Sequence, residues 1–181
     1  MLYCCLMALP APFKPVHLLF INLLTDSLPA LAIGMEPTDK KLLQEKPRDP
    51  KMGIMTKDFV MHLLGYGFMI AIVTMIAFYL GLQTDAAMAS TMAFATLTLA
   101  RLFHGFNCRS NQSIFRIGLM SNSWSVGAFV LGIAFLSIVL FVPFMKKLFF
   151  VSTLSGVQLV YIVGLAVLPT VFIQITRALR K

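Results

Sequence analysis

The sequence predicts an all-α integral membrane protein, built as a helical bundle. Hydrophobic residues make up 59% of the 181 residues, whereas only 12% are charged. Soluble domains typically contain about 45–50% apolar and about 25% charged residues, so one buried core cannot account for this excess. The apolar residues also fall into runs of about 20, the length that a helix needs to cross the hydrocarbon core. A lipid bilayer is therefore the expected environment of the chain.

Five membrane spans are expected, and a shorter apolar segment precedes them. Residues 1–9 are apolar but too short to cross a bilayer, so we interpret them as the remnant of an earlier helix. Residues 10–181 then form one membrane domain. Its expected spans are residues 16–34, 59–82, 87–106, 124–145 and 156–179.

The positive charges predict how the spans are oriented. Of the 15 Lys and Arg residues, 11 lie in segments 35–57 and 107–122 or at the C-terminal end. The alternate connections hold only Lys14, Lys146 and Lys147. Because cytoplasmic loops are enriched in Lys and Arg, the basic segments and the C-terminus are expected in the cytoplasm. The charges alternate with apolar blocks and form no basic patch on a soluble face, so a nucleic-acid partner is not expected.

Glycine and proline positions give further expectations about the helices. The short segment 83–86 predicts a tight turn that pairs the second and third spans as a hairpin. Three prolines in segment 35–57 predict an irregular loop. The prolines in the last two spans are expected to bend helices or to mark their ends. Four glycines are expected to allow close helix packing. These residues are Pro143 and Pro169, and Gly65, Gly67, Gly127 and Gly132.

The first span carries the residues that point to chemistry. Asn22, Thr25 and Asp26 are three and four positions apart, so in an α-helix they share one face. Pro29 has no N–H for the carbonyl of Thr25, and the helix is expected to loosen there. Carboxylate, amide, hydroxyl and carbonyl oxygens are hard ligands that suit Ca²⁺ better than Zn²⁺ or Cu²⁺.

Two interpretations of this polar face remain open from the residues alone. A carboxylate in the middle of a membrane is energetically expensive and usually marks an ion path or a proton relay. Interrupted membrane helices also recur at ion sites. The alternative is structural: Asp26 makes only a buried ion pair or hydrogen bonds between helices, as Asn and Thr often do.

The same residues carry a resemblance to a known family. Residues 21–34 read INLLTDSLPALAIG and are similar to the sixth transmembrane helix of type II P-type ATPases, most of all the bacterial and sarcoplasmic-reticulum-type calcium pumps. Shorter motifs resemble the loop after that helix, and the end of the eighth helix with the loop beyond it. These are Glu36-Pro, Lys46-Pro-Arg and Asp49-Pro-Lys, and Phe106-Asn107 and Asn111-Gln-Ser113.

The resemblance implies a chain that runs from the end of helix five to helix ten of a cation pump. It implies that Asn22 and Asp26 are Ca²⁺ ligands, with Thr25 nearby. The phosphorylated Asp-Lys-Thr-Gly motif does not occur in the sequence. ATP and Mg²⁺ would therefore be used only by the full-length pump, and no catalytic activity is expected of this chain alone. A bacterial cell membrane is the expected location.

Other functions remain open beside calcium transport. The chain could belong to a related pump that moves protons or sodium, because the ligands that distinguish these pumps lie in helices four and five. It could also be a stand-alone membrane scaffold without a transport role.

Arg101 departs from the pattern of the sarcoplasmic-reticulum-type pumps. The resemblance places it in the eighth helix, where those pumps have an acidic ligand. A guanidinium cannot ligate a cation and stays protonated. Our hypothesis is that Arg101 is a fixed internal counter-charge that can pair with Asp26, so that the pump carries one Ca²⁺ per cycle. The alternative is that its side chain only extends to the membrane interface.

Overall fold

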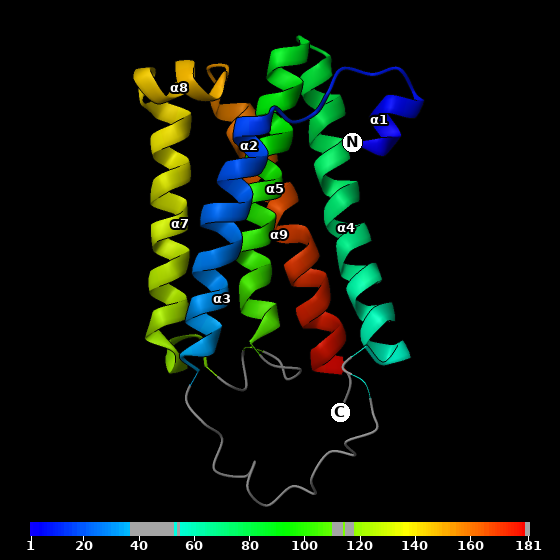
Figure 1. Ribbon diagram of the computed structural model, residues 1–181, viewed down its shortest axis with the longest axis vertical. Helices are drawn as coiled ribbons and strands as arrows, with labels where there is room; N and C mark the ends of the chain where they lie inside the picture. Colours follow the sequence, from blue (N-terminus) through cyan, green and yellow to red (C-terminus); the bar gives the residue numbers. More distant parts are fainter. Residues whose placement is uncertain (37–52, 54, 110–113, 115–117, 180–181) are drawn as a thin grey trace, which may run out of the picture.

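A computed structural model describes residues 1–36, 53, 55–109, 114 and 118–179 of the chain (Figure 1). Every regular element in this part is a helix, which confirms the predicted all-α fold. The five helical spans that are long and apolar enough to cross a membrane are Pro15–Gly34, Phe59–Leu82, Ala86–Cys108, Ser123–Phe141 and Gly156–Leu179.

The first span is divided into three consecutive segments, and short helices lie between or before the spans. The elements are α1 (Leu2–Leu6), α2 (Pro15–Phe20), the π-helix η1 (Ile21–Asp26), α3 (Ser27–Gly34), α4 (Lys57–Leu82), α5 (Ala86–Cys108), the 3-10 helix η3 (Leu119–Ser121), α7 (Ser123–Phe141), α8 (Pro143–Phe149) and α9 (Gly156–Leu179).

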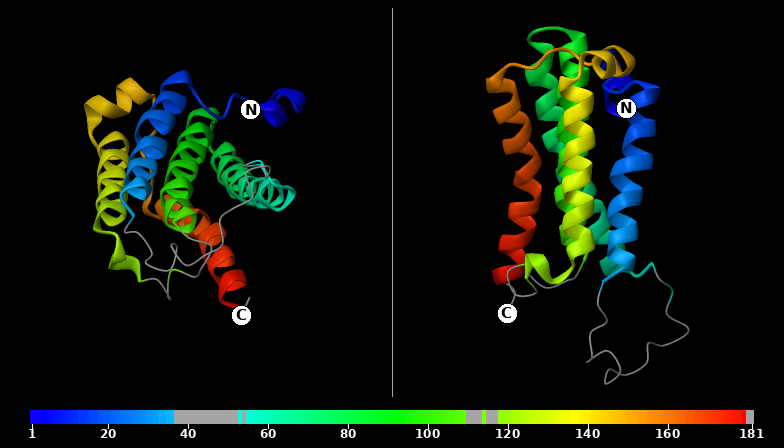
Figure 2. Two further views of the ribbon diagram at one scale, coloured as in Figure 1. Left: turned by 60° about the horizontal axis from the view of Figure 1, so that its bottom comes forward. Right: turned by 90° about the vertical axis from the view of Figure 1, so that its left-hand side faces the viewer.

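Helix α5 is the centre of the bundle. About 67% of its span is buried, compared with 22–28% of the other four. It contacts α4, α7, α9 and the first span, and Figure 2 shows it between them. Its small residues Ala93, Ala95 and Ala100 are almost fully buried and allow the neighbouring helices to approach closely. The other spans therefore expose their outer faces, as expected for helices that contact lipid.

The helix ends are arranged as the alternation of charges requires. The ends of α3, α5 and α9 and the starts of α4 and α7 lie at one end of the bundle, opposite α8 and the α4–α5 turn (Figure 1). That turn joins Leu82 to Ala86 and confirms the predicted hairpin. Three sequence predictions fall largely outside the described residues. They concern the irregular loop in segment 35–57, the motif at 111–113 and the last two basic residues.

The prediction for the fourth span was wrong at its end. We expected residues 124–145, but α7 ends at Phe141 and α8 begins at Pro143. Val142 is extended (φ −77°, ψ 123°), because the ring of a following proline disfavours the α conformation. Helix α8 lies across the end of the bundle (Figure 1). Pro143 thus marks a helix end, as expected, whereas Pro169 lies inside α9.

Only one of the four glycines that we predicted to allow close helix packing does so among the described residues. A Cβ atom at Gly132 would lie 2.5 Å from Leu102, so this prediction is confirmed. At Gly65, Gly67 and Gly127 it would meet no described atom within 4 Å, so these predictions were wrong for this part of the chain. Unpredicted close contacts are at Gly81, which lies against the backbone of α5, and at Gly105, which lies against Pro29.

The N-terminal segment packs beside α4. The hydroxyl groups of Tyr3 and Tyr79 are 2.9 Å apart, and Cys4 is buried in a small cluster with Phe78 and Ala89. Helix α1 has only five residues. The interpretation of residues 1–9 as the remnant of a helix stays a prediction.

Candidate cation site

The predicted polar residues of the first span all lie in its π-helical segment. Asn22, Thr25 and Asp26 belong to η1, which ends three residues before Pro29. The missing N–H of Pro29 leaves the carbonyl of Thr25 without its α-helical partner, so the preceding turn can widen. The expected loosening of the helix is therefore present. Single π-helical turns in long helices are frequent at functional sites.

The π-helical turn separates the three side chains. It holds more residues than an α-helical turn, so a residue three positions along turns away from the face, whereas one four positions along stays near it. Thr25 is buried, and its hydroxyl donates to the carbonyl of Ile21 at 2.7 Å. Asn22 is exposed, and the side chain of Asp26 is 36% exposed. Asn22 and Asp26 are thus accessible, whereas Thr25 points into the protein, contrary to the expectation of one shared face.

Asp26 forms an ion pair with the central helix. Its Oδ2 lies 2.8 Å from a terminal guanidinium nitrogen of Arg101, which is 37% exposed. The structure thus shows the pairing that we expected Arg101 to be able to make. Both side chains remain more than a third exposed in the described part of the chain.

A cavity of about 460 Å³ lies beside this ion pair. Its walls come from the first span, α4 and α5 and are mostly apolar, including Leu63, Ile70 and Leu97. Asp26 and Arg101 line it together with Thr25 and His104, whereas Asn22 is not among the lining residues. A charged pair in a cavity with mostly apolar walls is the feature expected of a site for a small ion.

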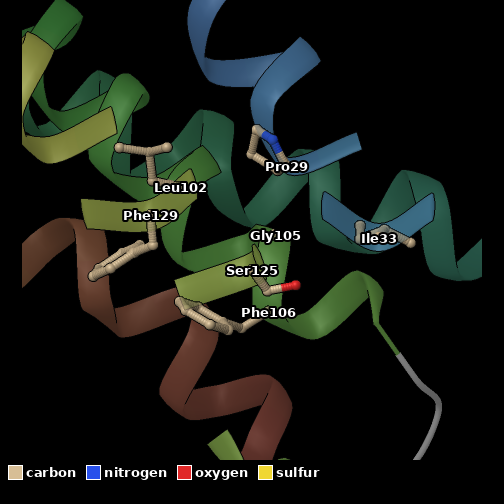
Figure 3. Close-up of a pocket in the computed structure, with 7 residues that line it drawn as sticks. All are labelled: Pro29, Ile33, Leu102, Gly105, Phe106, Ser125 and Phe129. Atoms are coloured by element: carbon tan, nitrogen blue, oxygen red, sulfur yellow. The ribbon is translucent and has the colours of Figure 1, made fainter. Parts of the chain in front are cut away.

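Below the ion pair, α3, α5 and α7 pack tightly. Figure 3 shows the small space where Pro29, Gly105 and Ser125 from the three helices meet. Its volume is about 10 Å³, roughly the minimum for one water molecule. A Cβ atom at Gly105 would lie only 3.2 Å from the Cβ of Pro29. This space is a packing gap, and the larger cavity is the candidate site.

A polar cluster, hereafter the Glu36 cluster, joins the same three helices at their common end. It consists of Glu36, Arg109, Ser121 and Asn122. The Nε of Arg109 donates to Glu36 at 3.0 Å, and a terminal nitrogen donates to the other carboxylate oxygen at 2.7 Å. Arg109 also donates to Ser121 at 2.6 Å. The hydrogen bonds from Arg109, followed by the one from Asn122, lower the pKa of Glu36 despite partial burial.

Asn122 connects this cluster to the backbone of two helices. Its side-chain amide donates to Glu36 at 2.6 Å and to the carbonyl of Ala32 at 2.9 Å. Its Oδ1 accepts from the N–H of Ser125 at 3.1 Å and so caps α7. Asn122 is only 2% exposed. The end of α3 is therefore tied to the start of α7.

A second buried polar cluster joins α5 to α9. Gln174 donates to the Oδ1 of Asn107 at 2.6 Å and accepts from the N–H of Ile114 at 2.9 Å. Asn107 also donates to Thr170 at 3.2 Å, and its carbonyl accepts from Arg177 at 2.9 Å. These bonds satisfy polar groups that would otherwise be buried without partners. Their arrangement indicates a structural role.

Sequence reasoning missed several of these contacts. From the sequence we did not identify His17, which is fully buried: its Nε2 lies 2.7 Å from the carbonyl oxygen of Phe149, and its ring stacks on Phe94. Glu36 and Asn122 were not singled out as interacting residues. Their partners are more than 70 positions away in sequence, so no local pattern reveals them.

Among the described residues, no three His, Cys, Asp or Glu side chains gather closely enough to hold a metal ion. Asp26 is the carboxylate at the candidate site, and the exposed amide of Asn22 comes from the same π-helical segment. Any cation held here by this part of the chain would therefore depend on Asp26 and neutral oxygen ligands.

Residues 10–179 match the family model for the cation transporting ATPase C-terminus. The chain belongs to this family. It is 34% identical over 184 residues to a calcium-transporting ATPase of Bacillus subtilis, covering 100% of this chain and 21% of that protein. It is 36% identical over 172 residues to a calcium-transporting ATPase of Listeria monocytogenes, and this match covers 94% of this chain and 19% of that protein. The human calcium-transporting ATPase type 2C member 1 is 31% identical to it over 163 residues, and this match covers 88% of this chain and 18% of the human protein.

The predicted resemblance to the P-type pumps is thus confirmed, and with it an integral, multi-pass membrane protein. The chain spans about a fifth of the length of these relatives. The roles of Asn22, Thr25, Asp26 and Arg101 stay predictions.

Proposed function

We propose that this chain is the C-terminal transport region of a calcium-transporting P-type ATPase and contributes part of its cation site. The relatives that cover it are calcium-transporting ATPases. The observation that carries the proposal is the accessible carboxylate of Asp26, which lies in a π-helical segment of a membrane span and lines the 460 Å³ cavity. The bilayer and the rest of the pump are its partners, and use of ATP and Mg²⁺ belongs to that remaining part.

The proposed ligands are the oxygens that this segment presents. Asp26 supplies a carboxylate, and Asn22 supplies an exposed amide oxygen. Such hard oxygens are the ligands that Ca²⁺ prefers. The hydroxyl of Thr25 donates to the backbone and is buried, so we assign Thr25 a place beside the site and not in the ligand set. We place the protein in a bacterial cell membrane with its C-terminus in the cytoplasm, as the Lys and Arg distribution favours.

Arg101 acts in this proposal as a counter-charge. Its guanidinium neutralises Asp26 when no cation is bound, through a single 2.8 Å contact that a cation can displace. A bound Ca²⁺ would replace the guanidinium at the carboxylate. Because Arg101 remains protonated, it repels a second cation. The proposal therefore includes one Ca²⁺ per cycle.

The test of Asp26 uses the complete pump. Asp26→Asn should abolish or severely weaken calcium-dependent phosphorylation from ATP, whereas phosphorylation from inorganic phosphate without calcium should remain. Asp85→Asn is the matched control, because Asp85 only caps α5 at the other end of the bundle and Asn caps helices equally well. An unchanged calcium dependence in Asp26→Asn would leave Asp26 with a structural role.

The test of Arg101 counts bound calcium per phosphorylation site. One Ca²⁺ is expected in the wild type, and Arg101→Met should change the calcium affinity and its pH dependence. Two ions per wild-type pump would refute the counter-charge hypothesis. So would an Arg101→Met variant with both properties unaltered.

A further inference from the structure

Three residues at the end of α5 contact the first span and the segment just after it. Arg101 and Gly105 of α5 contact Asp26 and Pro29, and Arg109, the residue after α5, binds Glu36, two residues after α3. Arg101, Gly105 and Arg109 are four positions apart, so they lie one above another. The first span is thus held against α5 from the candidate ligand to the segment that follows α3.

The two charged contacts differ in strength. The Asp26–Arg101 pair has one close contact and side chains 36% and 37% exposed. In the Glu36–Arg109 pair, two parallel hydrogen bonds of 3.0 and 2.7 Å form, and the arginine side chain is 3% exposed. Bidentate, charge-assisted bonds are the stronger kind, and burial reduces their screening. When α3 moves, the Asp26 pair is therefore the one that breaks first.

The Glu36 cluster also immobilises the backbone of α3. Asn122 binds both the carboxylate of Glu36 and the carbonyl of Ala32 while it caps α7. The end of α3 is therefore fixed to two other helices at once. Between this end and Asp26, Pro29 packs closely on Gly105, where a Cβ atom would lie 3.2 Å from the Cβ of Pro29.

We infer that Glu36, Arg109 and Asn122 are positioning residues for the cation site. They hold the end of α3 in place, so that Asp26, ten residues or roughly 15 Å away along the helix, can exchange Arg101 for a cation without displacing the whole helix. The inference rests on the proposed role of Asp26 as a ligand. Without the Glu36 cluster, the carboxylate would occupy a wider range of positions, and the cation would bind more weakly.

The experiment measures, in the complete pump, the calcium concentration that gives half-maximal phosphorylation from ATP. Glu36→Gln should raise it at least about fivefold, the lower end of usual couplings between separate sites. Maximal phosphorylation from inorganic phosphate without calcium should stay near wild type, because that reaction needs no cation at Asp26. Arg109→Lys keeps the charge but lacks the bidentate fork, and should raise the concentration by a smaller factor.

The control separates positioning from general stability. Gln174→Ala disrupts the second buried polar cluster, whose hydrogen bonds among the described residues join α5 and the segment after it to α9. It should lower the melting temperature without changing the half-maximal calcium concentration. If Gln174→Ala and Glu36→Gln raise that concentration in proportion to their loss of stability, the Glu36 cluster is only structural and the inference is overturned.

Failure of this inference and failure of the proposed function give different results. If Asp26→Asn abolishes calcium dependence but Glu36→Gln and Arg109→Lys leave the half-maximal concentration unchanged, only the positioning role is wrong. If Asp26→Asn has no effect, the ligand assignment itself fails. Should Glu36→Gln not accumulate in the membrane, Arg109→Lys alone decides: an unchanged half-maximal concentration overturns the inference.

Discussion

The contact between Gly81 and α5 predicts a large effect from a single methyl group. A Cβ atom at Gly81 would lie 2.6 Å from the Cα of Ala89 and 2.8 Å from its nitrogen. It would thus be about 0.8 Å short of ordinary van der Waals contact, which begins near 3.4 Å. The obstructing atoms are backbone, so no side-chain rotation relieves the clash. Gly81→Ala must therefore move α4 and α5 apart beside their turn.

The magnitude follows from comparison with a second glycine in the same helix. An alanine at Gly65 would meet no described atom within 4 Å. Gly65→Ala gains about 1 kcal/mol of helix propensity in the interior of α4, and Gly81→Ala gains at most that amount, because Gly81 lies in the last turn. The difference between the two variants is therefore mainly the steric effect, which for overpacked sites is typically about 1–3 kcal/mol. We expect Gly65→Ala to stabilise the chain and Gly81→Ala to be about 1–3 kcal/mol less stable than Gly65→Ala.

The assay is reversible unfolding of the 181-residue chain in SDS, followed by circular dichroism in mixed micelles. The free energy of unfolding is compared among the wild type and the two variants under identical conditions. Equal free energies for Gly65→Ala and Gly81→Ala would refute the reasoning, because they would show that the hairpin accommodates the methyl group without strain.

Three further predictions concern polar groups and orientation. Gln174→Leu leaves the buried Oδ1 of Asn107 without its donor and should lower the free energy of unfolding by about 1–2 kcal/mol, and a loss below about 0.5 kcal/mol would contradict this. The lowered pKa of Glu36 means that its stabilising contribution is present above the ordinary value of 4.5 and is lost as the pH falls through the folded-state value. The stability difference between wild type and Glu36→Gln should accordingly shrink from pH 7 to below pH 4.5, and a constant difference would be the contrary result. In a cysteine-free background, Lys147→Cys should react with an impermeant thiol reagent from outside the cell and Lys57→Cys should not, and labelling of both from outside would reject the orientation.

The membrane fold could be predicted because lipid imposes a long, simple pattern on the sequence. A run of about 20 apolar residues has one main structural solution in a bilayer, so α4 and α9 begin and end within two residues of the predicted spans. The predicted end of the fourth span was wrong because of one proline. Apolar residues continue past Val142, but Pro143 breaks the backbone there, and local backbone geometry decided the boundary.

The candidate site could be predicted only in part. The carboxylate in a membrane span identified Asp26, and the resemblance to the calcium pumps identified Arg101 as a residue that can pair with it. The prediction that Asn22, Thr25 and Asp26 share one face was wrong. It assumed α-helical spacing, whereas the three residues lie in a π-helix. The Glu36 cluster was missed because its members come from three helix ends, and only the packing of the bundle brings them together.

The placement of the site between α5 and the first span has a physical consequence for transport. Helix α5 is packed on nearly every side, so its charges are fixed in position, whereas the first span is loosened where it carries the carboxylate. A carboxylate that exchanges one partner for another needs a rigid helix on one side and a helix that can adjust on the other. In the function that we propose, a cation would replace the guanidinium of Arg101 at the carboxylate of Asp26, and the loosened π-helical turn would be the part that adjusts. The Asp26–Arg101 pair has one close contact, so a cation has fewer bonds to displace there than at the bidentate Glu36–Arg109 pair. On the same proposal, the stronger pair at the end of α3 would keep the helix in register while the turn around Asp26 changes shape.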